Sequence, residues 1–141
     1  MEGNQQKILA ITKSLIGTPY KYAAAPEDIP KYLDCSSFTQ YVYKQIGIEI
    51  PRSTLLQAAH SGKEFELTTE LQPGDLLFFR GSKGHYDDML FPERTIYIGH
   101  VTIYSGSNKA IHASHPNGVI EENIDNIIKT RGPIVMVRRI L

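Results

Sequence analysis

Residues 34–47 read Asp34-Cys-Ser-Ser-Phe-Thr-Gln-Tyr-Val-Tyr-Lys-Gln-Ile-Gly47, and this stretch sets the pattern for the first half of the chain. Its apolar spacing predicts a helix from Cys35 to about Ile46. Asp34 is a good N-cap and Gly47 a stop signal, so the only cysteine of the sequence falls in the first helical turn. A thiol there lies near the positive end of the helix dipole, which predicts a lowered pKa and a reactive thiolate. The alternative is a small buried core residue.

Helical patterns dominate the rest of the first half, and strand patterns the second. A helix is expected over 5–16, and a short one after Pro51 with Ser53 as its cap, ending before Gly62. Residues 80–94 are polar and predict a long loop. The expected strands are 76–79, 96–104, 110–113, 119–120 and 134–141, with a hairpin turn over 105–108. This order predicts an α+β fold, with residues 1–141 forming a single domain.

Composition excludes several classes of protein. The 141 residues carry 15 basic and 15 acidic side chains, which argues against a nucleic-acid-binding module. No apolar run approaches the roughly 18–20 residues that a membrane span needs. A secretory leader pattern is also missing, which leaves open a cytoplasmic protein, export by another route, or a mature form. One cysteine excludes an intrachain disulfide scaffold and a multi-cysteine zinc module.

Two histidines fall where they could assist the cysteine. His100 lies in a strand pattern and should point the same way as Ile98 and Thr102, as a general base held on a rigid element. His112 lies in the next strand, and the hairpin would allow it to bond and orient the ring of His100. The alternatives are a strand histidine satisfied by a backbone carbonyl and a surface histidine on an edge strand.

The other histidines show no partner at a meaningful spacing. His60, His85 and His115 are interpreted as solvated. A zinc site built from the cysteine and histidines is weakly supported, because neither a CxxC nor an HxxxH pattern is present.

Six segments in order resemble the NlpC family of papain-like cell-wall cysteine peptidases. They are Gly17-Thr-Pro-Tyr20, Leu33-Asp-Cys-Ser36 with Phe38-Thr-Gln-Tyr-Val-Tyr43, Pro51-Arg-Ser-Thr54 with Gln57, Leu71-Gln-Pro-Gly-Asp-Leu-Leu-Phe-Phe79, Gly99-His-Val-Thr-Ile-Tyr104 and Ala110-Ile-His-Ala-Ser114. The resemblance runs from about Ile8 to near Arg139, which is almost the whole sequence.

The resemblance implies a papain-like core whose nucleophile starts a helix packed on a mostly antiparallel sheet that carries both histidines. It implies hydrolysis of amide bonds in peptidoglycan stem peptides or muropeptides, commonly after γ-D-glutamate, with no cofactor or metal ion. The residues that match the family's functional positions are Cys35 as nucleophile, His100 as base, His112 as third member, Tyr20 as a pocket residue, and Asp34 and Ser36 as ligands of the substrate's free amino end.

The sequence departs from the family pattern at three places. Ala23-Ala-Ala25 replaces the usual glycine pair and Ser37 replaces a glycine, so both add Cβ atoms expected near the cleft. Residues 80–98 are longer than the usual connection and predict a lid or specificity loop. Alternatives are an amidase or acyltransferase for another acyl substrate, a catalytically silent wall-binding module, and a secreted antibacterial effector. The sequence leaves the oligomeric state open.

Overall fold

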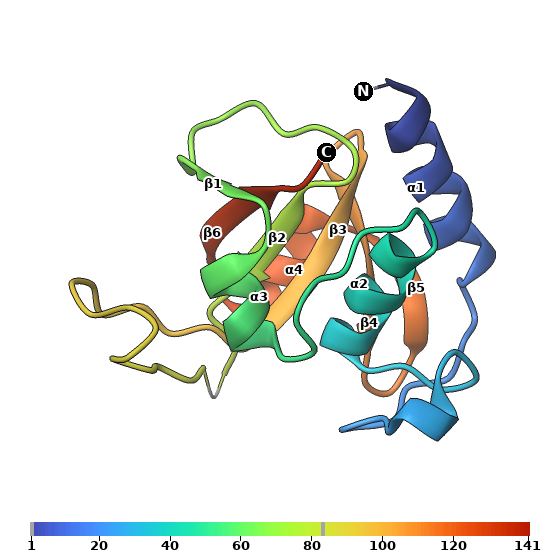
Figure 1. The fold of residues 1–141 in the computed structure, drawn as a ribbon, viewed down its shortest axis with the longest axis horizontal. Coiled ribbons are helices and arrows are strands. Elements are labelled where there is room, and N and C mark those ends of the chain that lie inside the picture. The colour runs from blue at the N-terminus through green and yellow to red at the C-terminus, as the bar shows by residue number, and fades with distance from the viewer. Residues whose placement is uncertain (1, 83) are drawn as a thin grey trace.

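A computed structural model describes residues 2–82 and 84–141 and contains one six-stranded sheet (Figure 1). The strands, in chain order, are β1 (Lys63–Phe65), β2 (Leu76–Phe79), β3 (His100–Gly106), β4 (Lys109–Ser114), β5 (Gly118–Asn123) and β6 (Ile134–Arg139). The helices are α1 (Glu2–Ser14), α2 (Cys35–Lys44), α3 (Thr54–His60) and α4 (Ile124–Arg131), with a 3-10 turn η1 (Pro26–Asp28). The sheet order is β1-β6-β2-β3-β4-β5, and its neighbouring strands are antiparallel. The predicted α+β class is therefore confirmed.

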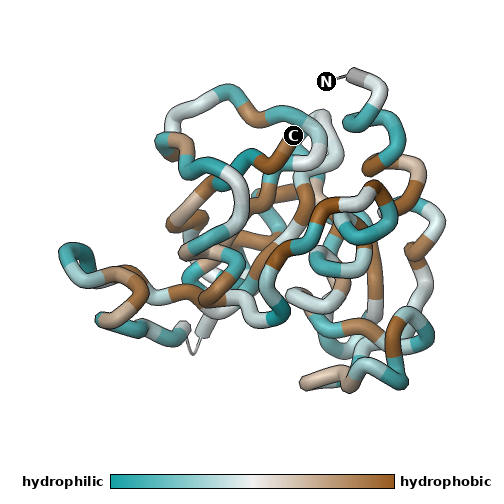
Figure 2. Tube along the Cα trace, in the orientation of Figure 1, coloured by the Kyte–Doolittle hydropathy of each residue, from teal (hydrophilic) through white to brown (hydrophobic). Residues whose placement is uncertain are grey.

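The central strand β2 is covered on both faces, which explains its uninterrupted apolar run. Leu76 and Phe78 belong to the larger core cluster, on the face that α2 covers. Leu77 and Phe79 belong to a second cluster with residues of α4 such as Ile127. Figure 1 shows α2 in front of the sheet and α4 behind it, and Figure 2 shows the apolar central strands between them. Alternating side chains thus build two apolar layers.

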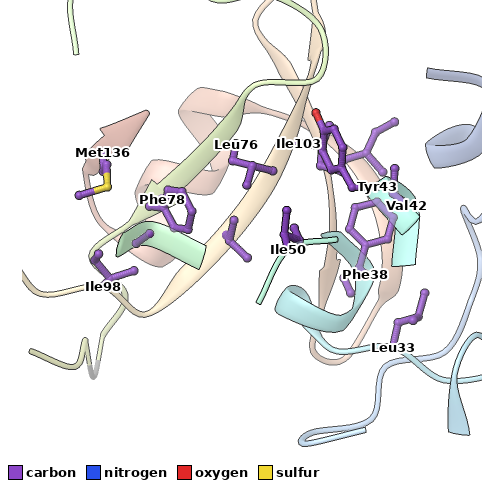
Figure 3. Close-up of a cluster of buried hydrophobic side chains, with 14 of the residues drawn as sticks. Leu33, Phe38, Val42, Tyr43, Ile50, Leu76, Phe78, Ile98, Ile103 and Met136 are labelled. Carbon is purple, nitrogen blue, oxygen red and sulfur yellow. The ribbon is translucent and has the colours of Figure 1, made fainter. Parts of the chain in front are cut away.

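Helix α2 is fixed at its start by a cap and along its length by apolar packing. The Asp34 carboxylate accepts a hydrogen bond from the backbone N–H of Ser37 at 2.8 Å, as the sequence predicts for an N-cap. Phe38 and Val42 are fully buried against the sheet and lie beside Ile103 (Figure 3). The cap and the packed face together place Cys35 as the first residue of the helix.

Two other predicted turns and caps are also confirmed. The Ser53 hydroxyl caps α3 by accepting from the N–H of Leu56 at 3.1 Å. Ser107 and Asn108 link β3 to β4 with φ values of 53° and 59°, the pairing that a two-residue hairpin turn requires. None of the helices within 2–82 and 84–141 has both the length and the apolar character that crossing a membrane requires.

Three elements differ from the sequence-based expectation. Strand β3 starts at His100 instead of residue 96, because Ile98 pairs with His85 in an isolated bridge instead of with β2. Ile98 packs in the α2-side cluster with Val101, so the prediction that it shares a face with His100 is wrong. The helix α4 and the short strand β1 were not expected. The segment after residue 83 extends away from the sheet as an arm, yellow in Figure 1, whose Phe91 is nevertheless buried in the larger cluster.

Candidate active site

A cleft of about 420 Å³ opens where the start of α2 meets the start of β3. Cys35 and His100 both line it, although they are 65 residues apart in the sequence. Four further residues that the sequence places at or near the cleft also line it, namely Tyr20, Ala23, Asp34 and Ser36, and those not expected there are Arg52, Thr54, His85 and Arg131. The fold therefore brings one thiol, one imidazole and several polar groups to a shared space.

Cys35 is half-buried, and its thiol is held by neutral neighbours. Its Sγ lies 3.6 Å from the hydroxyl Oγ1 of Thr54. Burial raises the pKa of the thiol above its ordinary value, although hydrogen bonds from Thr54 and the backbone of Val101 act in the opposite direction. The prediction of a lowered pKa at the helix start is therefore wrong for the free protein, because desolvation outweighs the groups that favour the thiolate.

The pH dependence of alkylation checks this conclusion. We expect the rate at which iodoacetamide labels Cys35 to keep rising with pH beyond about 8.5, where an ordinary thiol titrates. The reason is that only the thiolate reacts, and burial raises the pKa at which the thiolate forms. N-acetylcysteine in the same buffers is the control. A rate that is already level near neutral pH would instead show a preformed thiolate–imidazolium pair.

His100, His112 and Glu122 form a hydrogen-bonded row across β3, β4 and β5. His100 Nε2 lies 2.7 Å from His112 Nδ1, and His112 Nε2 lies 2.9 Å from Glu122 Oε1. A carboxylate only accepts, so His112 carries its proton on Nε2 and presents Nδ1 as the acceptor. His100 then donates from Nε2, and its Nδ1 is left without a proton. The row therefore sets the tautomer in which His100 can act as a base.

Both rings are neutral near neutral pH. Burial, His112 and Arg131 together hold the pKa of His100 well below its ordinary value. Burial also lowers the pKa of His112, and the nearby Glu122 carboxylate opposes this shift. The cleft of the free protein thus holds a neutral thiol and a neutral imidazole.

Asp34 holds the wall of the cleft together. Besides capping α2, it accepts from the backbone N–H of Ala24 at 3.1 Å and from Arg52 at 2.6 Å. Arg52 also donates to Ser36 Oγ at 2.7 Å and to the Ala24 carbonyl at 2.9 Å. Burial would raise the pKa of Asp34, but the Arg52 guanidinium and the Ser37 N–H hold it below its usual range. The loop before α2 and the segment before α3 are thereby tied to the start of the helix.

The departures from the family pattern have different structural consequences. Ala23 lines the cleft and has a φ of 53°, a left-handed conformation that glycine adopts more easily. Ser37 is fully buried, and its hydroxyl accepts from the Asp34 N–H at 2.8 Å, so its side chain strengthens the helix cap. Of these two substitutions, only Ala23 therefore changes the lining of the cleft.

The remaining predicted residues lie around this centre. Tyr20 is half-buried on the cleft wall, and burial raises its pKa. His115 is exposed and meets Tyr20 edge-on, with ring centroids 5.7 Å apart. His60 and His85 are exposed as expected, but His85 also lines the cleft at the base of the arm. Within the described part of the chain, no three His, Cys, Asp or Glu side chains cluster so that they could hold a metal ion.

A known protein family covers most of this chain. The family model described as "NlpC/P60 family" matches residues 17–134, a range that contains the whole row of titratable residues and the cysteine. The chain belongs to the NlpC/P60 family. The predicted resemblance is therefore confirmed over most of the sequence.

Relatives of this NlpC/P60 chain include two bacterial proteins named as probable endopeptidases. It is 37% identical over 120 residues to "Probable endopeptidase p60" of Listeria grayi, covering 85% of this chain and 19% of that protein. It is 33% identical over 112 residues to "Probable endopeptidase NlpC" of Escherichia coli K12, covering 79% and 62%. The chain thus spans less than two thirds of the length of either relative.

Solved structures share the fold of this NlpC/P60 chain. The NlpC/p60 domain of the peptidoglycan hydrolase SagA superposes with a TM-score of 0.72 at 28% identity, covering 96% of this chain and 98% of that one. NlpC1 of Trichomonas vaginalis has a TM-score of 0.77 at 24% identity and covers 97% and 44%, which supports the fold alone.

Proposed function

We propose that this NlpC/P60 chain is a cysteine peptidase that hydrolyses amide bonds in peptidoglycan stem peptides through an acyl-cysteine intermediate. The observation that carries the proposal is the shared cleft of Cys35 and His100, with His100 fixed by the row to Glu122. Relatives named as endopeptidases and a structural relative named as a peptidoglycan hydrolase support the substrate class.

In the first half of the reaction, His100 Nδ1 takes the thiol proton while Cys35 Sγ bonds to the amide carbonyl carbon. The carbon–nitrogen bond of the tetrahedral intermediate then breaks. The proton passes from His100 to the leaving amine, and a thioester remains on Cys35. In the second half, His100 removes a proton from water, and the resulting hydroxide attacks the thioester. The acid leaves, and the proton returns to Sγ.

Oxyanion stabilisation is assigned to the start of α2. The backbone N–H of Cys35 is at the first helical position, where it has no intrahelical acceptor. It can therefore donate to the developing oxyanion at a point where the helix dipole also favours negative charge. Tyr20 on the cleft wall is a candidate second donor, and its raised pKa keeps its hydroxyl protonated.

The bond that we propose is cleaved is the amide between γ-D-glutamate and a diamino acid. Asp34 and Ser36 are the candidate ligands for the free amino end of the substrate. In this chain Asp34 already bonds Ser37 and Arg52, so an ammonium group would share the carboxylate with the Arg52 guanidinium. Ser36 Oγ lies beside both groups, accepting from Arg52 at 2.7 Å.

Digestion of defined substrates tests this proposal. Free stem peptides, muropeptides and intact sacculi are incubated with the wild type and with Cys35→Ala, and the products are identified by mass spectrometry. We expect a new amino terminus on the diamino acid with the wild type alone. Cleavage at a different amide would contradict the proposed bond, and no cleavage of any of the three would contradict the substrate class.

The role of Glu122 is to position His112, and its removal gives a distinct prediction. We expect Glu122→Gln to lower kcat by about tenfold, a part of the ~10²–10⁴-fold that a general base contributes. The amide can donate as well as accept, so the tautomers of His112 and His100 are no longer fixed. Loss of the negative charge also lowers the pKa of His112. Because His112 must be neutral to accept the hydrogen bond from His100, the acid limb of the kcat/KM profile should move to lower pH.

The matched control is Glu121→Gln. Glu121 is the exposed neighbour on β5 and accepts from Ser105 at 2.7 Å, so the change in charge is the same. If both variants keep the wild-type kcat and acid limb, Glu122 has no positioning role.

A further inference from the structure

Arg131, the last residue of α4, brings a guanidinium group to the wall of the cleft. One of its terminal nitrogens donates to the hydroxyl of Ser114 at 2.9 Å. Its backbone carbonyl accepts from Gly81 N–H at 2.6 Å, which fixes the end of the helix beside β2. Arg131 is a site residue that was not expected from the sequence pattern.

Arg131 differs from three other arginines of the chain, which are paired with carboxylates. Arg52, Arg94 and Arg139 each form an ion pair with a carboxylate at 2.6–2.9 Å. Among residues 2–82 and 84–141, no carboxylate forms an ion pair with Arg131, and a neutral hydroxyl is its side-chain partner. A half-buried guanidinium retains free donors suited to a planar anion.

The positive charge of Arg131 shifts the pKa values of groups in the cleft. It acts to lower the pKa of Cys35, His100 and Tyr20, so it lies within electrostatic reach of all three. The other cation on the cleft wall, Arg52, is neutralised by Asp34. Among the described residues, the cleft therefore has one arginine paired with a carboxylate and one that is not.

We propose that Arg131 binds a carboxylate group of the substrate next to the scissile amide. An arginine fork and a carboxylate form paired, charge-assisted hydrogen bonds, and the Ser114 hydroxyl holds the fork in place. The inference rests on the proposed function for its choice of substrate. A γ-linked D-glutamate keeps its α-carboxylate free, and the diamino acid carries a carboxylate as well, so both flank the bond.

Binding of such a carboxylate also affects the base. Arg131 contributes to the lowered pKa of His100. A carboxylate that neutralises Arg131 removes this effect, so His100 becomes a stronger base when the substrate is in place. Recognition of the substrate carboxylate and activation of the thiol are then coupled. A substrate with an amide in place of that carboxylate should lack both effects.

The first test compares stem peptides that differ in one carboxylate. One set carries D-glutamate or D-isoglutamine, and a second carries the diamino acid with or without its free carboxylates. We expect removal of one of these substrate carboxylates to lower the kcat/KM of the wild type by about 10- to 100-fold, the usual range for a charged hydrogen bond. Arg131→Gln should remove the difference, and Arg131→Lys should restore part of it. Lys129→Gln, an exposed cation of the same helix, is the control for overall charge.

The outcomes separate the two proposals. If the wild type cleaves all the peptides at similar rates, the carboxylate site is overturned and the peptidase stands. The comparison of substrates with the wild type needs no variant, so a poorly folded Arg131→Gln protein would not prevent this decision.

A second measurement is independent of the peptide substrate. Iodoacetate and iodoacetamide label the same thiol, but only iodoacetate carries a carboxylate. We expect the ratio of their rates at Cys35 to exceed that of N-acetylcysteine and to fall several-fold in Arg131→Gln but not in Lys129→Gln. If no peptide is cleaved but this ratio depends on Arg131, the proposed peptidase fails and the carboxylate site stands. A ratio equal to that of N-acetylcysteine in every protein overturns the site.

Discussion

Replacement of Cys35 by alanine is expected to lower kcat/KM for stem peptides by at least about 10⁴-fold, as loss of a covalent nucleophile does in other hydrolases. His100→Ala should cost a similar factor, because an unassisted neutral thiol attacks an amide poorly and burial makes the thiolate scarce. The double variant should be little worse than either single one, because the two side chains act as a unit. Steady-state kinetics on one defined peptide gives all three values.

Two further variants make the comparison specific. His115→Ala removes an exposed histidine that contacts Tyr20, so it should retain most of the activity. His112→Ala should be milder than His100→Ala, because an orienting group is partly replaceable. Circular dichroism establishes that each variant is folded. Retention of hydrolysis by folded Cys35→Ala would contradict the proposed nucleophile, and purely additive losses would contradict the coupled pair.

Asp34→Ala is expected to have the largest effect on stability among the residues of the cleft. The change removes the cap of α2, worth about 1 kcal/mol. It also leaves the Ala24 N–H without its acceptor and the half-exposed Arg52 guanidinium without its carboxylate partner. We expect the free energy of unfolding to fall by about 2–4 kcal/mol, and Tm by roughly 10 °C. Activity should also fall below that of the folded fraction, since the start of α2 positions Cys35.

Denaturant and thermal unfolding of Asp34→Ala and of a second cap variant measure this effect. Asn123→Ala is the matched control, because Asn123 caps α4 by accepting from Asp125 N–H at 2.9 Å and has no arginine partner. It should cost only about 1 kcal/mol. Equal losses in the two variants would show that the network around Arg52 contributes nothing beyond the cap.

Local signals explain which parts of the fold could be predicted. The caps Asp34 and Ser53 and the turn at Ser107 are set by neighbouring residues, so the sequence pattern alone finds them. Helix α4 shows the limit of such signals. Its cap at Asn123 and the apolar Ile124 and Ile127 are short cues over only eight residues, and the need for it comes from the far face of β2. A continuous apolar strand already implies a second covering layer.

The residues of the site also differ in whether the local sequence identifies them. Cys35, His100 and His112 could be selected from the sequence because their residue types and the hairpin between the histidines are visible there. Glu122 and Arg131 could not, because their positions depend on the register of β5 and on where α4 ends. The thiol pKa was also predicted in the wrong direction, since the burial that raises it arises only from the folded cleft.

The most direct test of the central claim is to digest a stem peptide in the presence of hydroxylamine. An acyl-cysteine partitions between water and hydroxylamine, so the wild type should release the diamino acid fragment together with both the free γ-D-glutamyl acid and its hydroxamate. Mass spectrometry resolves the two acyl products, and Cys35→Ala should form neither. Release of the amine fragment without any hydroxamate, or its release by Cys35→Ala, would contradict an acyl intermediate on Cys35.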